Sequence, residues 1–184
     1  GLISNSNGFA NELEILQSTR VNSRVVKSLK LYVNYAIEGR VQKIEQYQCN
    51  PIIVDMPQHQ LTELQTPIEM EMTKLGEGLH VMGRVRVSGS KEPVTFEHDV
   101  EKLPGSVNTP MGVIIFQQNP GAKWGEEKLF ATINPVERGA RTYRSKLSAA
   151  ATAKNTTMAR VTFTDTQIKR SMDYLNELLK CYNE

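Results

Sequence analysis

Apolar residues recur with helical spacing near the start of the chain. Val21, Val25 and Leu29 lie four positions apart, so they share one face of a helix. Ser18 precedes them and is a residue type that caps helix N-termini with its hydroxyl group. A shorter piece, ELEILQ, follows Asn11, which we expect to cap it in the same way. The pattern therefore predicts helical structure over residues 11–29.

The last twenty residues, DTQIKRSMDYLNELLKCYNE, predict a second helix over residues 166–184 with Asp165 as its N-cap. Its apolar residues alternate spacings of four and three, which is typical of a seam that packs against another helix. The seam consists of Ile168, Met172, Leu175, Leu179 and Tyr182. No glycine, Asn-Gly or proline stop signal follows. We expect a truncated long helix whose seam packs on its own domain near Ile168 and on other helices further along.

Between these ends the periodicity changes to that of strands. LYVNYAI alternates apolar and polar positions, Glu38-Gly39 can turn the chain, and RVQKIEQY can return beside it. A helical continuation is the alternative for this segment. Glycine and proline then punctuate a series of strand-like runs over residues 51–133, namely IIVDM, PIEMEMTKLGEGLHVMGRVRV, PVTFEHDV, GVIIFQQ and KLFATI. This block predicts an inserted all-β domain, either a small sandwich or a barrel.

Helical signals return at NPVERGARTYRSKL, where Asn134 can cap, Pro135 takes the first helical position and Glu137 completes a capping box. Two strands around a turn at Lys154-Asn155 follow. The fold class predicted is α+β. One domain, a mixed sheet flanked by helices, comprises residues 1–50 and 134–184, and the inserted β-rich domain comprises residues 51–133.

Composition limits the function classes without choosing one. The 184 residues are 39% hydrophobic and 23% charged, as in an ordinary globular protein, and the net charge of +2 does not indicate nucleic-acid binding. No run is long and apolar enough for a membrane span, and we expect no signal peptide within these residues. Cys49 and Cys181 are far apart in sequence, which favours two free thiols over a disulfide without deciding between them.

Catalytic and metal-binding signals are weak, so we expect no enzyme activity, cofactor or metal site in this chain. The three histidines, His59, His80 and His98, form no His-x-His or His-Glu-x-x-His pattern. Glycosidases need paired carboxylates, and the dense acidic candidates are Glu69, Glu71, Glu97 and Asp99. On alternating strand positions, such acids are usually the polar face of a sheet.

Two further features suggest binding surfaces. Trp124, in the turn-rich stretch NPGAKWGEE, can stack on a sugar ring if exposed or pack on the β block if buried. Arg138, Arg141 and Arg144 recur every three residues along one predicted helix. They are either a solvated face or a basic patch that faces anionic lipid headgroups.

Two segments of the chain resemble a known family. They are NELEILQSTRVNSRVVKSLKLYVNYAIEGRVQKIEQY and INPVERGARTYRSKLSAAATAKNTTMARVTFTDTQIKRSMDYLNELLKCYNE. Together they are similar to the periplasmic region of chain-length determinant (Wzz-type) proteins. The likeness is strongest to the capsular exopolysaccharide transport proteins and tyrosine autokinases of the Bacteroides group. The central β block matches by position only.

The resemblance implies a membrane-proximal α/β domain between two membrane helices absent from this sequence, in the periplasmic portion of an inner-membrane protein. It implies ring-like homo-oligomers that regulate polysaccharide chain length and export, and partners that include the polymerase, an outer-membrane export protein and the growing polysaccharide. Some members carry a cytoplasmic tyrosine kinase domain, but this chain contains no phosphate loop from which kinase residues follow. A carbohydrate-binding module is the alternative function.

Overall fold

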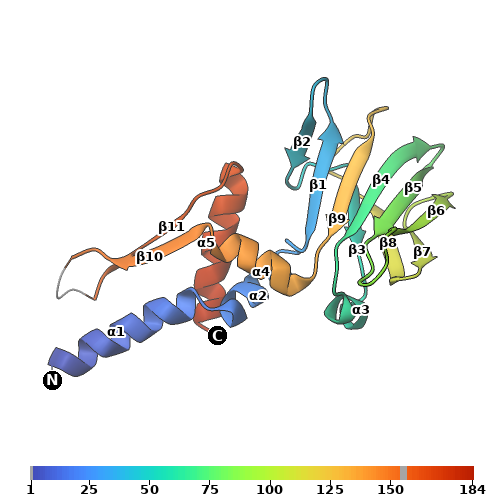
Figure 1. The fold of residues 1–184 in the computed structure, drawn as a ribbon. Coiled ribbons are helices and arrows are strands. Elements are labelled where there is room, and N and C mark those ends of the chain that lie inside the picture. Colours follow the sequence, from blue (N-terminus) through green and yellow to red (C-terminus); the bar gives the residue numbers. More distant parts are fainter. Residues whose placement is uncertain (1, 154–156) are drawn as a thin grey trace. The chain divides into compact units, whose positions relative to one another are not determined.

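The computed structural model describes residues 2–153 and 157–184, with side chains from residue 8 onward. The fold is α+β: in the described residues, helices and antiparallel strands form two compact units (Figure 1). The helical unit comprises Gly1–Leu31 and Val136–Glu184, and the β unit comprises Tyr32–Pro135.

The boundary between the units differs from the one drawn on the sequence at residues 50/51 and 133/134. Strand β1 (Val33–Glu38) pairs on one side with β2 (Lys43–Gln46) and on the other with β9 (Leu129–Ile133). The predicted hairpin over residues 31–47 is present, but its strands belong to a sheet of the β unit. The chain therefore changes unit at residues 31/32 and 135/136.

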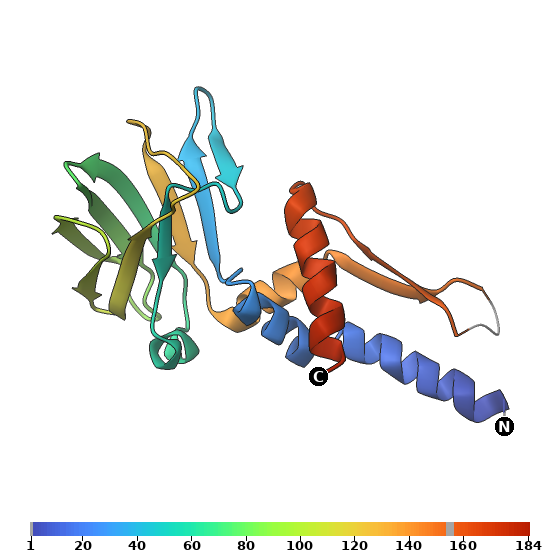
Figure 2. The same ribbon diagram turned by 180° about the vertical axis from the view of Figure 1, so that it is seen from behind.

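The helical unit is built from four helices and one hairpin among the described residues. Its elements are α1 (Leu2–Leu16), α2 (Thr19–Ser28), α4 (Val136–Arg144), β10 (Leu147–Ala151), β11 (Ala159–Phe163) and α5 (Ile168–Tyr182). Figures 1 and 2 show α1 and the β10–β11 hairpin extending in the same direction from the part of the unit where α2, α4 and α5 meet. The turn predicted at Lys154-Asn155 lies outside the described residues.

The two predicted caps near the N-terminus have opposite outcomes. The Ser18 hydroxyl accepts a hydrogen bond from the Val21 amide at 3.2 Å, as expected of the N-cap of α2. Asn11 is not a cap, because α1 already begins at Leu2 and continues through it. Helix α2 ends where Lys30 takes a positive φ of 54° and the Leu31 amide donates to the Val26 carbonyl, a Schellman-type closure.

Helices α2 and α4 approach each other closely at Gly139. A Cβ atom at this position would lie 3.2 Å from Cγ1 of Val26, tighter than most real contacts. The absence of a side chain at Gly139 thus leaves room for Val26 at this helix–helix contact.

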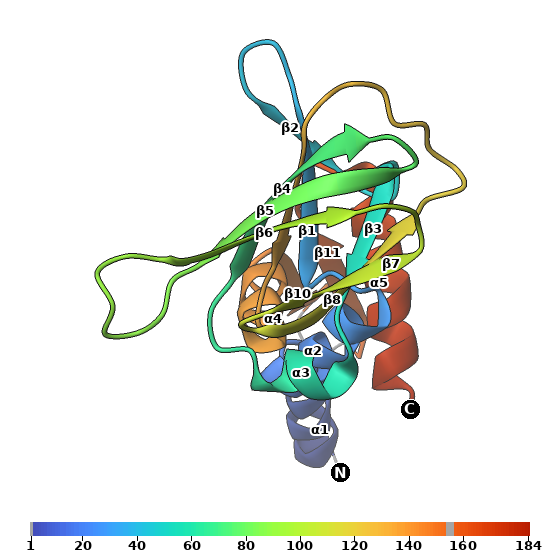
Figure 3. The same cartoon turned by 90° about the vertical axis from the view of Figure 1, so that its right-hand side faces the viewer.

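The β unit is a sandwich of two antiparallel sheets, seen from the side in Figure 3. The first sheet has the strand order β2-β1-β9-β4-β5-β6, and the second has the order β3-β8-β7. The strands not yet given are β3 (Ile52–Asp55), β4 (Ile68–Leu75), β5 (Gly78–Val85), β6 (Val94–Val100), β7 (Gly105–Thr109) and β8 (Gly112–Gln118).

Alternation along the strands places the core between the two sheets. Ile68, Met70 and Met72 of β4 are buried, whereas their neighbours Glu69 and Glu71 lie on the opposite face. The smaller sheet contributes buried apolar side chains of its own, including Ile52, Val54, Val107, Ile114 and Phe116.

Two tyrosine hydroxyls, one on β1 and one on the residue that precedes it, form hydrogen bonds with β3. The Tyr32 hydroxyl donates to the Asp55 carboxylate at 2.6 Å, and the Tyr35 hydroxyl accepts from the Val54 amide at 2.8 Å. Burial is the main reason that the pKa of Tyr35 is raised, which keeps the hydroxyl neutral.

Two short elements of the β unit were not predicted from the sequence. Strand β7 is five residues long and contains no apolar run. Helix α3 (Gln58–Glu63) is only six residues long. Helix α3 buries Leu61, and the Gln60 side-chain oxygen accepts from the Val113 amide beside Gly112, where φ is +119°. Both elements depend on tertiary contacts rather than on local periodicity.

Candidate functional site

The C-terminal helix α5 packs on the helical unit with a face different from the predicted seam. Its fully buried side chains are Arg170, Tyr174, Leu178 and Cys181. Polar contacts to α2 run beside them: the Ser28 hydroxyl donates to Glu177 at 2.6 Å, and Arg24 pairs with Glu184 at 2.7 Å.

The predicted seam is therefore left on the outside of α5. The side chains of Ile168, Met172 and Leu179 are 78%, 60% and 49% exposed, and Leu175 and Tyr182 are half-buried. The expectation that the seam packs on its own domain near Ile168 is wrong, because the helix turns that residue outward. We call the residues Ile168, Met172, Leu175 and Leu179 the α5 stripe.

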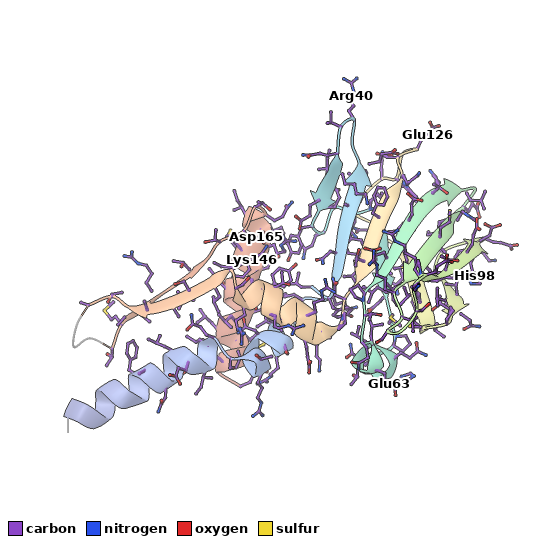
Figure 4. All side chains as sticks on the ribbon, in the orientation of Figure 1. Arg40, Glu63, His98, Glu126, Lys146 and Asp165 are labelled. Atoms are coloured by element: carbon purple, nitrogen blue, oxygen red, sulfur yellow. The ribbon has the colours of Figure 1, made fainter. Side chains whose placement is uncertain are left out.

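Asp165 is not the N-cap of α5, which begins at Ile168 after Gln167. Its side chain is fully buried and forms an ion pair with Arg170 at 2.5 Å, while Lys146 lies 3.3 Å away (Figure 4). Burial alone would raise the pKa of Asp165, but the hydrogen bond and charge of Arg170, with Lys146, hold it well below its usual range. The carboxylate thus fixes the start of α5 through side chains instead of backbone amides.

The centre of the helical unit is an aromatic and amide cluster. Tyr174 stacks on Phe163 with ring centroids 4.4 Å apart and on Tyr143 at 5.7 Å. The Tyr174 hydroxyl donates to the side-chain oxygen of buried Asn22, whose amide group donates to the Leu16 and Ser18 carbonyls at 3.0 and 2.7 Å. Every polar atom of this asparagine is engaged, so the cluster fixes how α5 sits on α2.

The three arginines of α4 do not act alike. Arg138 and Arg141 are exposed, whereas Arg144 is half-buried and donates to the Thr19 hydroxyl at 2.8 Å. Two residues of the predicted basic patch are thus exposed cations, and the third, Arg144, links α4 to the start of α2 through its hydrogen bond.

The outer face of the six-stranded sheet contains an open hollow of about 760 Å³. Outward-pointing side chains of β2, β9, β4, β5 and β6 line it: Lys43, Glu69, Glu71, Met82, Arg84, Thr95, Glu97, Phe130 and Thr132. We call this surface the sheet-face hollow. The Lys43 ammonium lies 3.9 Å from the centroid of the Phe130 ring, and Ala36, directly opposite Phe130 on β1, leaves room beside that ring.

The dense acidic residues of the β unit all lie on this outer face, and each has a basic neighbour. Glu69 pairs with Arg84 at 2.6 Å, and Glu71 lies 3.5 Å from Lys128. The arrangement does not bring two carboxylates together without a base between them, as a glycosidase pair would require.

His80 lies between the other two acidic residues. Its Nδ1 is 2.5 Å from Asp99 and its Nε2 is 2.7 Å from Glu97. The hydrogen bond to Asp99 is the main cause of a raised pKa for His80, and Glu97 adds to the shift. An imidazolium donates from both ring nitrogens, so the protonated form joins β5 to β6.

Trp124 is half-buried and lines a second hollow of about 500 Å³ in the β unit. Its indole N–H donates to the Glu127 carbonyl at 2.8 Å, which fixes the ring, and Lys74 donates to the Trp124 carbonyl at 3.3 Å. The sequence left open whether this tryptophan is exposed or buried, and the structure shows it at the wall of a hollow.

The remaining candidates do not form sites. Cys49 is exposed, Cys181 is buried, and both are free thiols. Within residues 2–153 and 157–184, no group of three acidic, histidine or cysteine side chains is arranged to hold a metal ion.

Comparison with known proteins gives no family assignment: no family model matches the chain, and no curated protein matches its sequence significantly. In the part of the chain that the structure describes, no helix has both the length and the apolar character needed to cross a lipid bilayer.

The sheet-face hollow was missed at the sequence level. Its members are spread from Lys43 to Thr132, and only the strand order brings them together. Alternation in PIEMEM and KLFATI does indicate outward positions for Glu69, Glu71 and Phe130. The pattern does not reveal that β9 pairs with both β1 and β4. This pairing places Phe130 beside Glu71.

Proposed function

We propose that this chain is a non-enzymatic periplasmic domain of a polysaccharide co-polymerase, which regulates chain length and export of capsular polysaccharide by self-assembly. Its self-association presents repeated surfaces to the polymerase, the growing glycan and an outer-membrane export protein. Weak affinity for a single repeat of the polymer is then multiplied by the number of copies.

The α5 stripe is the observation that carries the proposal. Three large apolar side chains, Ile168, Met172 and Leu179, are exposed in one row on a helix whose opposite face is well packed. Their spacing of four and seven is that of helix–helix seams. Water contact with such a row is unfavourable, and a second copy of the helix removes it.

The helix is also held firmly enough to serve as an interface. Buried Asp165–Arg170 and Tyr174–Asn22 contacts fix its rotation, so the stripe has one defined direction on the helical unit. The exposed cations Arg138 and Arg141 are consistent with a neighbouring anionic lipid surface, as the membrane-proximal location proposed here requires.

Sedimentation over a wide concentration range tests self-association directly. To detect association that is too weak for sedimentation, a histidine-tagged form of the chain is also tethered to neutral phosphatidylcholine vesicles through a nickel-chelating lipid, which raises its local concentration. We expect disulfide cross-links between tethered copies that carry Leu179→Cys. Cross-linking no greater than that of Arg86→Cys, an exposed position in the β unit, would contradict the proposal.

A second function is favoured by Trp124. An indole ring fixed at the wall of a polar hollow, near Lys74, Glu77 and Lys102, is a common arrangement for sugar recognition. In this alternative the β unit is a carbohydrate-binding module. A change in Trp124 fluorescence during titration with oligosaccharides tests it, and no change at millimolar sugar would eliminate it.

A further inference from the structure

The sheet-face hollow has the form of a preformed ligand site. Its lining residues stand on strands of one hydrogen-bonded sheet, so the sheet itself fixes their relative positions. Its volume of about 760 Å³ lies within the range of sites for small molecules and short polymers. No loop closure is needed to form it.

The charges in the hollow nearly cancel, which limits the ligand class. Lys43 and Arg84 face Glu69, Glu71 and Glu97, so two positive groups stand against three negative ones. Phosphates, nucleic acids and polyanionic chains need a clear excess of positive charge, and this surface lacks one. A strongly cationic ligand would in turn meet Arg84 and Lys43.

Ion-paired side chains can bind hydroxyl groups without losing their own partner. Arg84 uses Nε toward Glu69 at 2.6 Å, and a guanidinium has further N–H donors in the same plane. The Glu69 carboxylate has lone pairs beyond the one that this bond engages. A sugar hydroxyl both donates and accepts, so neighbouring hydroxyls can bond to both members of such a pair.

Apolar surface lies beside these polar groups. Met82 is 47% exposed, and Phe130 is half-buried with Lys43 over its ring. An exposed cation–aromatic contact is weak, so a pyranose can take the place of the ammonium on the ring and bond to it through a hydroxyl. The C–H face of a sugar then packs on Phe130 and Met82.

We propose that the sheet-face hollow binds an uncharged oligosaccharide segment, with Phe130 and Met82 against its apolar face and the Glu69–Arg84 pair on its hydroxyls. The ligand class follows the glycan recognition proposed above, but the surface is separate from Trp124, so each can fail without the other.

Amide-resolved NMR titration of the chain tests this inference. The probes are cellohexaose, laminarihexaose and maltohexaose, which differ in linkage, and a polyuronate of matched length as the charged comparison. We expect at least one neutral hexaose at millimolar concentration to shift amides around Glu69, Arg84 and Phe130, and the polyuronate to bind no more tightly.

Two variants change the hollow without changing the core. Arg84→Gln removes the guanidinium from an exposed side chain, and Phe130→Leu keeps apolar bulk but removes the flat ring. Each should weaken binding about tenfold, the factor expected when one charged hydrogen bond or one aromatic contact is lost. Arg86→Gln, an exposed arginine two residues further along the chain, should bind like the original chain.

The outcomes separate the two glycan sites. Shifts confined to residues around Trp124 would overturn the sheet-face inference and support the alternative function of that tryptophan. Absence of shifts with all three neutral hexaoses, or equal binding by Arg84→Gln and Arg86→Gln, would also overturn it. Neither result bears on self-association through α5, which sedimentation and cross-linking measure.

Discussion

The helical unit and the β unit stabilise their interiors by different means. In the helical unit, buried Asn22, Asp165 and Arg170 sit among aromatic rings and determine how α5 is rotated. In the β unit, apolar side chains alternate with polar ones along the strands, so strand register is the main feature that separates core from surface. Buried polar pairs thus fix the rotation of α5 in the helical unit, and the alternation of apolar and polar residues fixes which strand faces are buried in the β unit. Loss of one core side chain and loss of one buried charge should therefore affect different units.

The largest effect is expected from the β core. Phe116→Ala removes a fully buried ring between the sheets and should lower the free energy of unfolding of the β unit by about 3–5 kcal/mol. Hydrogen exchange by mass spectrometry reports each unit separately. Protection should fall in β3, β7 and β8 but stay unchanged in α2 and α5. An equal loss in both units would show that they unfold together.

Asp165→Asn should destabilise the helical unit by about 3 kcal/mol, because it leaves the buried Arg170 charge without its partner. Asp173→Asn is the matched control: it breaks the Lys169 pair at the surface of the same helix and should cost only about 0.5 kcal/mol. Urea unfolding followed by circular dichroism measures both.

The same carboxylate predicts an acid limit for this unit. The pKa of Asp165 is lower in the folded state than in the unfolded chain. The ion pair therefore stabilises the fold fully above the unfolded-state pKa of about 3.9, and this stabilisation is lost as pH falls from there through the folded-state pKa. If Asp165→Asn and the original chain lose stability in parallel between neutral and acid pH, the ion pair does not have the assigned role.

Tyr174→Phe isolates the orientation effect without changing the ring. It leaves the side-chain oxygen of buried Asn22 without its donor, which should cost about 1–2 kcal/mol. Tyr182→Phe, on the same helix but without a buried partner, should change stability little. Similar losses in the two variants would contradict the assigned role of the cluster.

The smallest effect concerns pH and the outer face of the β unit. The pKa of His80 is raised, so the cross-strand contribution of its imidazolium is complete below the ordinary histidine pKa and is lost as pH rises through the raised value. NMR titration should show His80 losing its proton above the ordinary histidine pKa. Loss of the proton at or below that pKa would contradict the bonding to Asp99 and Glu97.

The sequence predicted the α+β class, the Ser18 cap and most strands, because those depend on local periodicity. It predicted that the residues of the α5 stripe form a helix–helix seam, but it placed the start of this seam against the chain's own domain, where the structure leaves Ile168 exposed. The face that α5 buries begins with Arg170, and a buried arginine gives no signal in an apolar pattern. The position of Asp165 beside Arg170 and Lys146 could not be seen either, since α4, β10 and β11 bring those residues together only in the fold.

The sheet-face hollow shows a second limit. Each outward residue is visible from alternation, but the chain order of the strands does not reveal that β9 lies between β1 and β4. Only this insertion of a late strand between two early ones places Phe130 and Lys43 in contact across β1.

The central claim is that the α5 stripe joins copies of this chain. The most direct test compares sedimentation and vesicle-tethered cross-linking of the original chain with a variant carrying Met172→Gln and Leu179→Gln, which keeps helix propensity. Asn176→Gln, an exposed position on the same helix outside the stripe, is the control. The account predicts association for the original chain and the control, and its loss in the double variant. Equal association of all three, or a strictly monomeric original chain when tethered, would contradict it.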